Sequence, residues 1–217
     1  TTECPSDRRA LGLSRESSGA ACTVEDVDHA GAVAVGQLLV ATQPGRGGYF
    51  DRTVVLIIER QSDAGGGATV GLCLNVMSEI PGGNVLSDYT DLMSPPVRVF
   101  EGGPVNQDVV VALGEPASLE SPPPGWERIS GDIGVVDVNY PSELLASSFT
   151  QLRVFVGLSA WSPGQLEGEL IRGSWVRTQV RSEDVFGDPD GLWRRVLRRM
   201  GGTTGRWSSW TDDPSMN

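Results

Sequence analysis

The sequence predicts a single α+β domain that contains more strand than helix. Short runs of β-branched and apolar residues recur through the middle of the chain, and turns rich in Gly and Pro separate them. Helical spacing of apolar residues is long and regular in one place, near the C-terminus. A chain of 217 residues is long enough to bury one core, and no internal repeat divides it.

The expected domain covers residues 34–200. Residues 1–33 mix Ser, Gly, Arg and acidic residues without hydrophobic periodicity, so we interpret them as a mobile polar leader. Residues 201–217 are mostly polar, and we expect an irregular C-terminal tail there.

Seven apolar runs have the composition of strands. The run at 52–59 is apolar on both faces, which predicts a strand buried on both sides. This run and the one at 69–75 flank a Gly-rich turn, so we expect them to form a hairpin. Residues 114–128 contain four prolines and predict an irregular surface loop. The expected strands are 36–41, 52–59, 69–75, 97–100, 108–113, 133–138 and 152–158.

Three further segments have helical features, besides the helix start considered below. The spacing of Val85, Leu86, Tyr89 and Leu92 predicts a short helix within 81–93. A proline in the first turn favours a helix at 141–149. The segment 188–200 predicts an amphipathic helix. Its apolar stripe is Leu192, Trp193, Val196, Leu197 and Met200, and its opposite face is Arg194, Arg195, Arg198 and Arg199.

The composition removes several classes of chemistry. The net charge is −11, and all 17 basic residues are Arg because the chain has no Lys. A Lys Schiff base and a P-loop Lys are therefore excluded. His29, the sole His, lies in the polar leader, away from the rigid scaffold that a Ser-His or Cys-His pair needs. A strongly acidic chain repels phosphate groups, so a nucleic-acid partner is disfavoured.

The cysteines indicate neither a disulfide framework nor a metal site. Cys4, Cys22 and Cys73 are widely spaced and odd in number, which favours reduced thiols, and Cys73 has the surroundings of an inert core thiol. No Cys-x-x-Cys pair is present to bind zinc, and we expect no metal and no cofactor. No apolar run reaches the roughly 18 residues of a membrane span, so we expect no membrane partner and a cytoplasmic location.

The apolar run that ends at Trp161 passes into the most distinctive helix start in the chain. Ser162 as the N-cap, Pro163 as the first helical residue and Gln165 two positions later fit an S-x-x-Q capping box. Trp161 can then pack on Leu166 as a hydrophobic staple. Capping rules alone therefore account for this part of the motif.

The rest of this helix leaves two acidic residues without an explanation from folding. We expect Leu166, Leu170 and Ile171 to face the core because they share one helical face. Glu167 and Glu169 would then be more exposed. With Trp161, they are candidates for the lining of a groove.

Other polar and glycine residues at strand ends are candidates for a ligand or partner surface, because ligand loops often lie there. Each also has a structural interpretation: an ion pair for Asp51 and Arg52, a turn-capping amide for Asn75, and a turn with positive φ for the Gly-Gly pair. The complete candidate set is Asp51, Arg52, Asn75, Glu101, Gly102, Gly103, Trp161, Glu167 and Glu169. No residue is assigned a catalytic role.

Several blocks of the chain, taken together, resemble the AlgH family, also called YqgE, of bacterial proteins. They are GQLLVATQPGRGGYFDRTVVLIIE at 36–59, VGLCLN at 70–75, VFEGGPV at 99–105 and RVFVGLSAWSPGQLEGELIRGSW at 153–175. The ending DDPSMN is similar to the tails of actinobacterial members, and the Lys-free composition also indicates an actinobacterial source. Two blocks depart from the family pattern: Val76-Met77 replaces Arg-Pro, and Leu158 replaces a Tyr.

The resemblance implies a fold but no established activity. The implied fold has coiled, branching, mostly antiparallel β-sheets that form a small barrel, with helices packed outside. A role in transcriptional regulation has been proposed for some members, and no agreed catalytic residues can be carried over.

We therefore expect a non-enzymatic regulatory or interaction protein whose partner is another protein or a small ligand. One alternative is a hydrolase that uses Glu101, Asp51 and Glu167 with a bound water or metal. A second alternative is direct DNA binding through the Arg194–Arg199 helix face. The sequence predicts neither the identity of the ligand nor the oligomeric state.

Overall fold

The computed structural model describes residues 33–42, 44–45, 47–61, 67–141, 145 and 147–211. The predicted leader, apart from Val33, lies outside the described residues, and so do the last six residues of the predicted tail. Four residues of the helix predicted at 141–149 also lie outside them.

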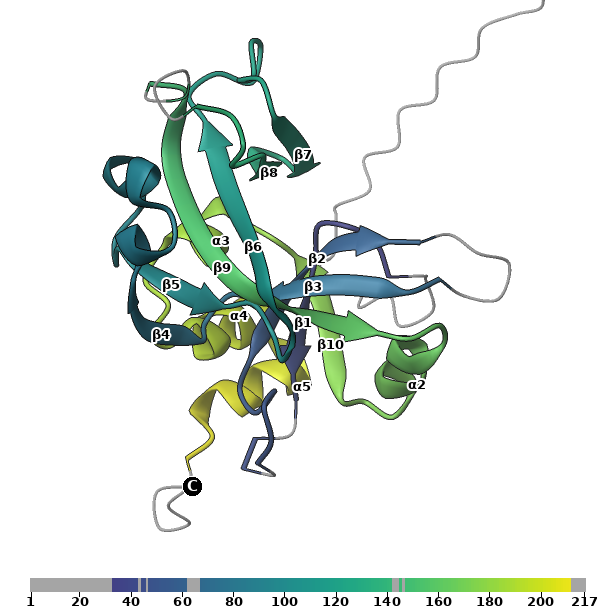
Figure 1. Cartoon of the computed structure of the whole chain (residues 1–217). Helices are drawn as coiled ribbons and strands as arrows, with labels where there is room; N and C mark the ends of the chain where they lie inside the picture. The colour runs from purple at the N-terminus through teal and green to yellow at the C-terminus, as the bar shows by residue number, and fades with distance from the viewer. Residues whose placement is uncertain are drawn as a thin grey trace, which may run out of the picture.

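Ten strands of the described chain form one strongly curled sheet (Figure 1). The main path has the order β10-β1-β2-β3-β9-β6-β8-β7, and β4 and β5 join it at β9. Every pair is antiparallel except β5 with β9. The strands are β1 Gln37–Ala41, β2 Val54–Arg60, β3 Thr69–Cys73, β4 Met77–Pro81, β5 Arg98–Glu101, β6 Val105–Pro116, β7 Trp126–Ser130, β8 Ile133–Val136, β9 Phe149–Trp161 and β10 Trp175–Gln179. The predicted α+β class and the β2–β3 hairpin are confirmed, and the sheet has the form of a curled half-barrel.

Strand β9 is shared by both halves of this sheet. Its last residues, Ser159–Trp161, pair with β3, whereas its earlier residues pair with β5 on one side and β6 on the other. Figure 1 shows β6 and β9 as two long, curved neighbours that pass through the middle of the molecule. The two halves of the sheet therefore branch from one strand.

The buried apolar residues form three clusters on different parts of the sheet. The first packs against α3 (Ser182–Phe186) and α4 (Leu192–Met200), which lie behind the sheet in Figure 1. The second contains two Trp residues and Leu166 of α2 (Gln165–Ile171). The third joins β6, β8 and β9 to the 3₁₀ turn η2 (Ser87–Leu92) and to Val85 and Leu86, which follow the 3₁₀ turn η1 (Gly82–Asn84). The helix predicted within 81–93 is thus two 3₁₀ turns instead.

The amphipathic helix near the C-terminus is confirmed, although it begins at Leu192 and not at residue 188. Leu192, Trp193, Val196 and Leu197 of its predicted stripe are buried. Residues 202–209 of the predicted irregular tail form α5 (Gly202–Gly205) and η3 (Arg206–Ser209), which follow α4 directly. Trp207 and Trp210 pack on the first cluster, since two indoles bury enough apolar area to fix an otherwise polar segment.

Besides α5 and η3, four elements have no counterpart in the sequence prediction: β4, β7, β10 and α3. Most residues of β4 are exposed and β7 has no buried residue, so neither strand has an apolar alternation to mark it. The loop predicted at 114–128 is correct only for 117–125, because β6 runs to Pro116 and β7 begins at Trp126. Strand β10 lies at the edge of the sheet and pairs with β1.

A buried guanidinium connects β9 to the helices behind the sheet. Arg153 is only 2% exposed, and its Cζ lies 4.5 Å from the centre of the Phe100 ring. Its Nη atoms donate hydrogen bonds of 2.7–3.1 Å to four carbonyls, those of Pro95, Val185, Phe186 and Gly187. Burial lowers the pKa of Arg153 to about 10, so the group is still charged at neutral pH. Carbonyl dipoles at the end of α3 therefore compensate the charge.

We predict that Arg153→Met lowers the free energy of unfolding by about 2–4 kcal/mol, because four buried carbonyls lose their donors. The matched control is Arg98→Met, which removes a partly exposed ion pair with Glu79 and costs less than about 1 kcal/mol. Urea denaturation followed by Trp fluorescence measures both. Equal losses in the two variants would contradict this role for Arg153.

Candidate functional site

Glu169 is a structural acceptor for two buried indoles. One carboxylate oxygen, Oε2, accepts hydrogen bonds from Trp161 Nε1 at 2.9 Å and from Trp175 Nε1 at 2.7 Å. The other oxygen accepts one from Gln165 Nε2 at 3.1 Å. Both Trp residues are at most 5% exposed, and each ring contacts Phe50. Folding therefore explains Glu169, which the sequence left unexplained.

The helix start before Glu169 differs from the predicted capping box. Helix α2 begins at Gln165, and the N-cap is Gly164 in the left-handed region, not Ser162. The Gln165 side chain still accepts a hydrogen bond of 3.1 Å from the Ser162 backbone N–H, as predicted. Leu166 shares a core cluster with Trp161, which confirms their packing. Ile171 is 87% exposed, so its predicted place in the core is wrong; the helix is too short to cover it.

Glu167, the second unexplained acid, forms an ion pair with Arg60. The distance from Glu167 Oε1 to Arg60 Nη2 is 2.9 Å, and the other Nη of Arg60 donates to the Val33 carbonyl. This pair attaches α2 to the end of β2. Neither acid of α2 faces an open groove as a free carboxylate.

The residues before and after the β2–β3 hairpin stabilise a loop. Asn75 Oδ1 accepts from Val54 N–H and its Nδ2 donates to the Arg52 carbonyl, both at 2.9 Å. Arg52 has φ 56°, a left-handed conformation that is strained for a side chain with Cβ. The Asp51 carboxylate accepts from Gly45 N–H at 3.1 and 3.2 Å. The two hydrogen bonds of the Asn75 side chain confirm the predicted turn-capping amide.

The Gly-Gly loop packs directly against the backbone of β9. A Cβ on Gly102 would lie 2.3 Å from Gly157 O, and one on Gly103 would lie 2.2 Å from Leu158 C. The Gly102 carbonyl accepts from Cys73 N–H at 2.8 Å and from Ser159 Oγ at 2.9 Å. Close approach of two backbones therefore requires both glycines.

Glu101 lies next to this loop and differs from the other candidate acids. No hydrogen bond or ion pair joins its carboxylate to another residue in the described part of the chain. Burial, and to a smaller extent the proximity of the acidic groups of Cys73 and Glu101, raise the pKa of Tyr49 well above its usual value. Burial also raises the pKa of Cys73 to about 12, so this thiol is protonated and unreactive at neutral pH.

Glu101 belongs to a row of side chains on the sheet face opposite α3 and α4. In the β5–β9–β6 register it stands beside Val156, which stands beside Val110. The adjacent row, with Phe100 and Phe155, packs into the first cluster, so the Glu101 row points the other way. Val110 and Val156 are only half-buried. We call this row, with the partly buried members of the third cluster, the front surface; those members are Val85, Leu86, Leu92, Trp126 and Val138.

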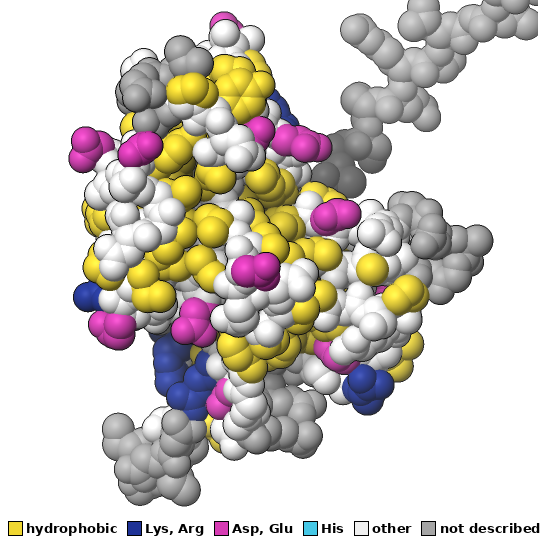
Figure 2. All heavy atoms as spheres, in the orientation of Figure 1, with side chains coloured by type: hydrophobic (Ala, Val, Ile, Leu, Met, Phe, Trp, Pro, Cys, Tyr) yellow, Lys and Arg dark blue, Asp and Glu magenta, His cyan; other side chains and the backbone are white. Residues whose placement is uncertain are grey.

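Figure 2 shows the front surface as a gathering of apolar side chains with Asp and Glu around it. Sequence reasoning missed it, although the run Val109–Val111 and the spacing of Val85, Leu86 and Leu92 were visible. Alternation along one strand does not reveal which face the helices leave uncovered. Only the register across β5, β9 and β6 shows which side chains share this face.

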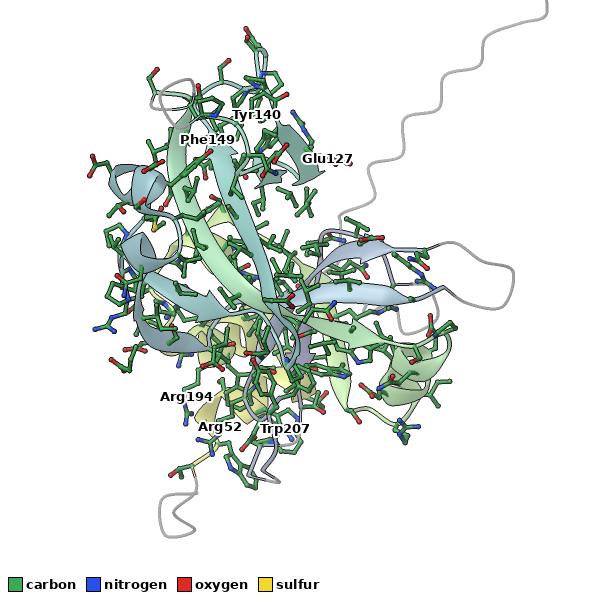
Figure 3. All side chains as sticks on the ribbon, in the orientation of Figure 1. Arg52, Glu127, Tyr140, Phe149, Arg194 and Trp207 are labelled. Atoms are coloured by element: carbon green, nitrogen blue, oxygen red, sulfur yellow. The ribbon has the colours of Figure 1, made fainter. Side chains whose placement is uncertain are left out.

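The proposed DNA-binding face of α4 is largely occupied by contacts within the chain. Arg194 donates to the Ser208 and Trp210 carbonyls, both at 2.6 Å. Arg199 forms a bidentate ion pair with the buried Asp184, with both N–O distances at 2.8 Å. Arg195 donates to the carbonyls of Asp188 and Asp190, which precede the helix. Figure 3 shows Arg194 at the lower end of the molecule, near Trp207 and Arg52. Arg194 therefore holds the C-terminal turns, and Arg199 joins α4 to α3.

The structure does not bring the carboxylates of the hydrolase hypothesis together. Glu101 adjoins the Cys73 end of β3, where Gly102 O accepts from Cys73 N–H. Glu167 pairs with Arg60, which is opposite Thr69 at the other end of β3. A strand of five residues spans about 13 Å. In the described residues no cluster of three His, Cys, Asp or Glu side chains could hold a metal ion, and no described helix is long and apolar enough to cross a membrane.

Comparisons with known proteins agree on one family. A family model described as AlgH-like matches residues 38–205. A UPF0301 protein of Streptomyces coelicolor is 41% identical over 187 residues, which cover 84% of this chain and 94% of that protein. A UPF0301 protein of Thermobifida fusca is 39% identical over 191 residues, with the same coverage. These relatives are actinobacterial, as the composition and the C-terminal sequence predicted.

Two solved structures have a similar fold. A crystal structure of a protein from Corynebacterium diphtheriae has a TM-score of 0.75 and 28% identity, and the match covers 83% of this chain and 94% of that one. The solution structure of the AlgH protein from Pseudomonas aeruginosa has a TM-score of 0.55 and 19% identity, with coverage of 82% and 94%. The second likeness concerns the fold alone.

We predict that Glu169→Ala lowers the free energy of unfolding by about 2–3 kcal/mol, because two buried indole N–H groups lose their acceptor. Glu169→Gln keeps an acceptor oxygen and should cost less. The control is Glu183→Ala, which removes an exposed carboxylate 3.4 Å from Arg181 and should change stability by less than about 1 kcal/mol. Denaturant titration measures all three. If Glu169→Ala matched the control, the indole contacts would not stabilise the fold.

We predict that Cys73 makes stability fall as the pH rises above 9. The unfolded thiol has its ordinary pKa of 9.0, whereas the folded thiol has a pKa of about 12. Between these values the unfolded chain loses the proton and the folded chain keeps it, so a contribution fully present below pH 9 is lost by pH 12. At pH 7 the free energy of unfolding of Cys73→Ala should be about 1–2 kcal/mol lower than that of the native chain. At pH 10.5 this difference should be smaller, because the native chain has then lost part of the contribution of Cys73. The control, Val54→Ala, should show a constant difference.

Proposed function

Because the chain belongs to the AlgH-like family, we propose that it is a non-enzymatic regulatory protein that binds a partner protein through the front surface. The observation that carries this proposal is the half-buried apolar row of Val110 and Val156, next to Leu86 and Leu92. Apolar side chains collected on one sheet face are typical of interaction sites.

The contacts that hold the candidate acids inside the fold support binding rather than catalysis. Glu169 and Glu167 are held by indoles and by Arg60, and Asp51 is held by a backbone N–H. A general acid or base needs a group that can reach a substrate proton. Glu101 is the candidate acid with no such internal contact in the described part of the chain, and its neighbours in the row are two valines.

The rigid position of the front surface also supports a recognition role. Strands β5, β9 and β6 are fixed from behind by Arg153 and the first cluster, so their front side chains are pre-organised. A pre-organised surface loses little conformational entropy when a partner binds. The regulatory part of the proposal follows from the family resemblance.

We predict that a Leu92→Ser/Val110→Ser variant loses the proteins that the native chain retains in affinity capture from an actinobacterial extract. The control is Ile171→Ser, which removes an 87% exposed apolar side chain outside the front surface and should retain them. Thermal unfolding shows whether both variants are folded. Equal retention by both variants would contradict the proposal. So would reproducible substrate turnover by the pure chain that is lost when Glu101 is changed to Gln.

A further inference from the structure

The front surface lies in an acidic part of the chain. Residues 77–116 contain six acidic residues and one basic residue, Arg98, which gives a net charge of −5. Arg98 is already paired with Glu79 at 3.0 Å. The six acidic residues are Glu79, Asp88, Asp91, Glu101, Asp108 and Glu115.

Three of these acids stand next to the apolar residues of the front surface and have no cationic partner. Asp91 precedes Leu92, Asp108 is two residues before Val110 on β6, and Glu101 is in the same row as Val110. None of the three forms an ion pair with another residue that the structure describes. Asp91 and Asp108 are exposed, and Glu101 is half-buried.

The spacing lets one bound segment contact both kinds of group. Adjacent strands lie about 4.8 Å apart, so Glu101 is about 10 Å from Val110 across β9. Lys and Arg side chains extend over apolar neighbours and keep the charge at their tip. An apolar side chain seated on Val110 and Val156 therefore leaves the basic residues beside it within reach of Glu101 and Asp108.

We propose that the front surface binds a cationic amphipathic helix of a partner protein, in which Leu-like side chains form one face and Lys or Arg residues flank it. This inference rests on the proposed function and specifies the chemistry of the partner. Apolar contacts with the valines and leucines supply most of the affinity, while the three carboxylates select basic over acidic segments and raise the association rate. A basic partner is favoured because no residue that the structure describes forms an ion pair with these three acids.

The test uses the full-length chain and three synthetic 16-residue peptides with a helical amphipathic pattern. One contains Leu and Lys, the second contains Leu and Glu, and the third contains Ser and Lys. We expect the Leu/Lys peptide to bind in fluorescence anisotropy and the other two to bind at least about tenfold more weakly. Equal binding of the Leu/Glu peptide would overturn the proposal.

A matched pair of variants separates local from overall charge. Neutralising Asp91, Glu101 and Asp108 to Asn, Gln and Asn should weaken Leu/Lys binding about tenfold, since each exposed ion pair contributes roughly a twofold to threefold gain in affinity. Neutralising Glu59, Glu183 and Asp190 changes the net charge equally but should leave binding unchanged. Equal weakening in both variants would show a non-specific charge effect and overturn the proposal.

Two results distinguish this inference from the proposed function. If protein capture depends on Leu92 and Val110 but is insensitive to the three carboxylates, the surface is correct and the partner chemistry is wrong. If sedimentation shows that the pure chain self-associates at low salt, and the Asp91/Glu101/Asp108 variant abolishes this, the occupant is a second copy and the partner proposal falls. A monomeric chain that binds the Leu/Lys peptide supports it.

Discussion

The fold depends on one close backbone contact, where the Gly102–Gly103 loop touches β9 at Gly157 and Leu158. Any Cβ at either loop glycine would lie within 2.3 Å of β9 backbone atoms, and such a distance cannot be accommodated without moving a strand. This contact allows the first part of β9 to pair with β5 and β6, and its last residues to pair with β3. The branching of the sheet, the separation of its three core clusters and the uncovered front surface all follow from that change of partner.

The sequence blocks that identify the family correspond to structural contacts rather than to a reaction centre. Asn75 holds the strained Arg52 backbone, the Gly-Gly pair lies against β9, and Glu169 accepts from two buried indoles. Each of these contacts joins residues far apart in the sequence, so each tolerates few substitutions. A distinctive motif is therefore weak evidence for catalysis when its polar atoms already have partners inside the fold.

Local patterns predicted most of the central strands and the apolar stripe of α4, because continuous apolar runs and helical spacing are recorded in neighbouring residues. They did not predict β4, β7 or β10, whose residues are largely polar or half-buried and become strands through pairing. The same limit applied to the candidate site. Glu169 seemed unexplained because Trp175 reaches it from another element, and the front surface was missed because it exists only across the register of β5, β9 and β6.

Charge is distributed unevenly along the chain in a way that bears on recognition. Residues 77–116 have a net charge of −5, whereas residues 172–206, which contain eight Arg and four acidic residues, have a net charge of +4. Several Arg residues of the second segment lie on α4, behind the sheet, whereas Glu101 of the first segment lies in the row that points the other way. A field of this kind orients a basic partner toward the front surface before contact, because long-range attraction acts on the encounter step. Carbonyl groups and Asp184 engage Arg194, Arg195 and Arg199, whereas Asp91, Glu101 and Asp108 form no ion pair with a residue that the structure describes.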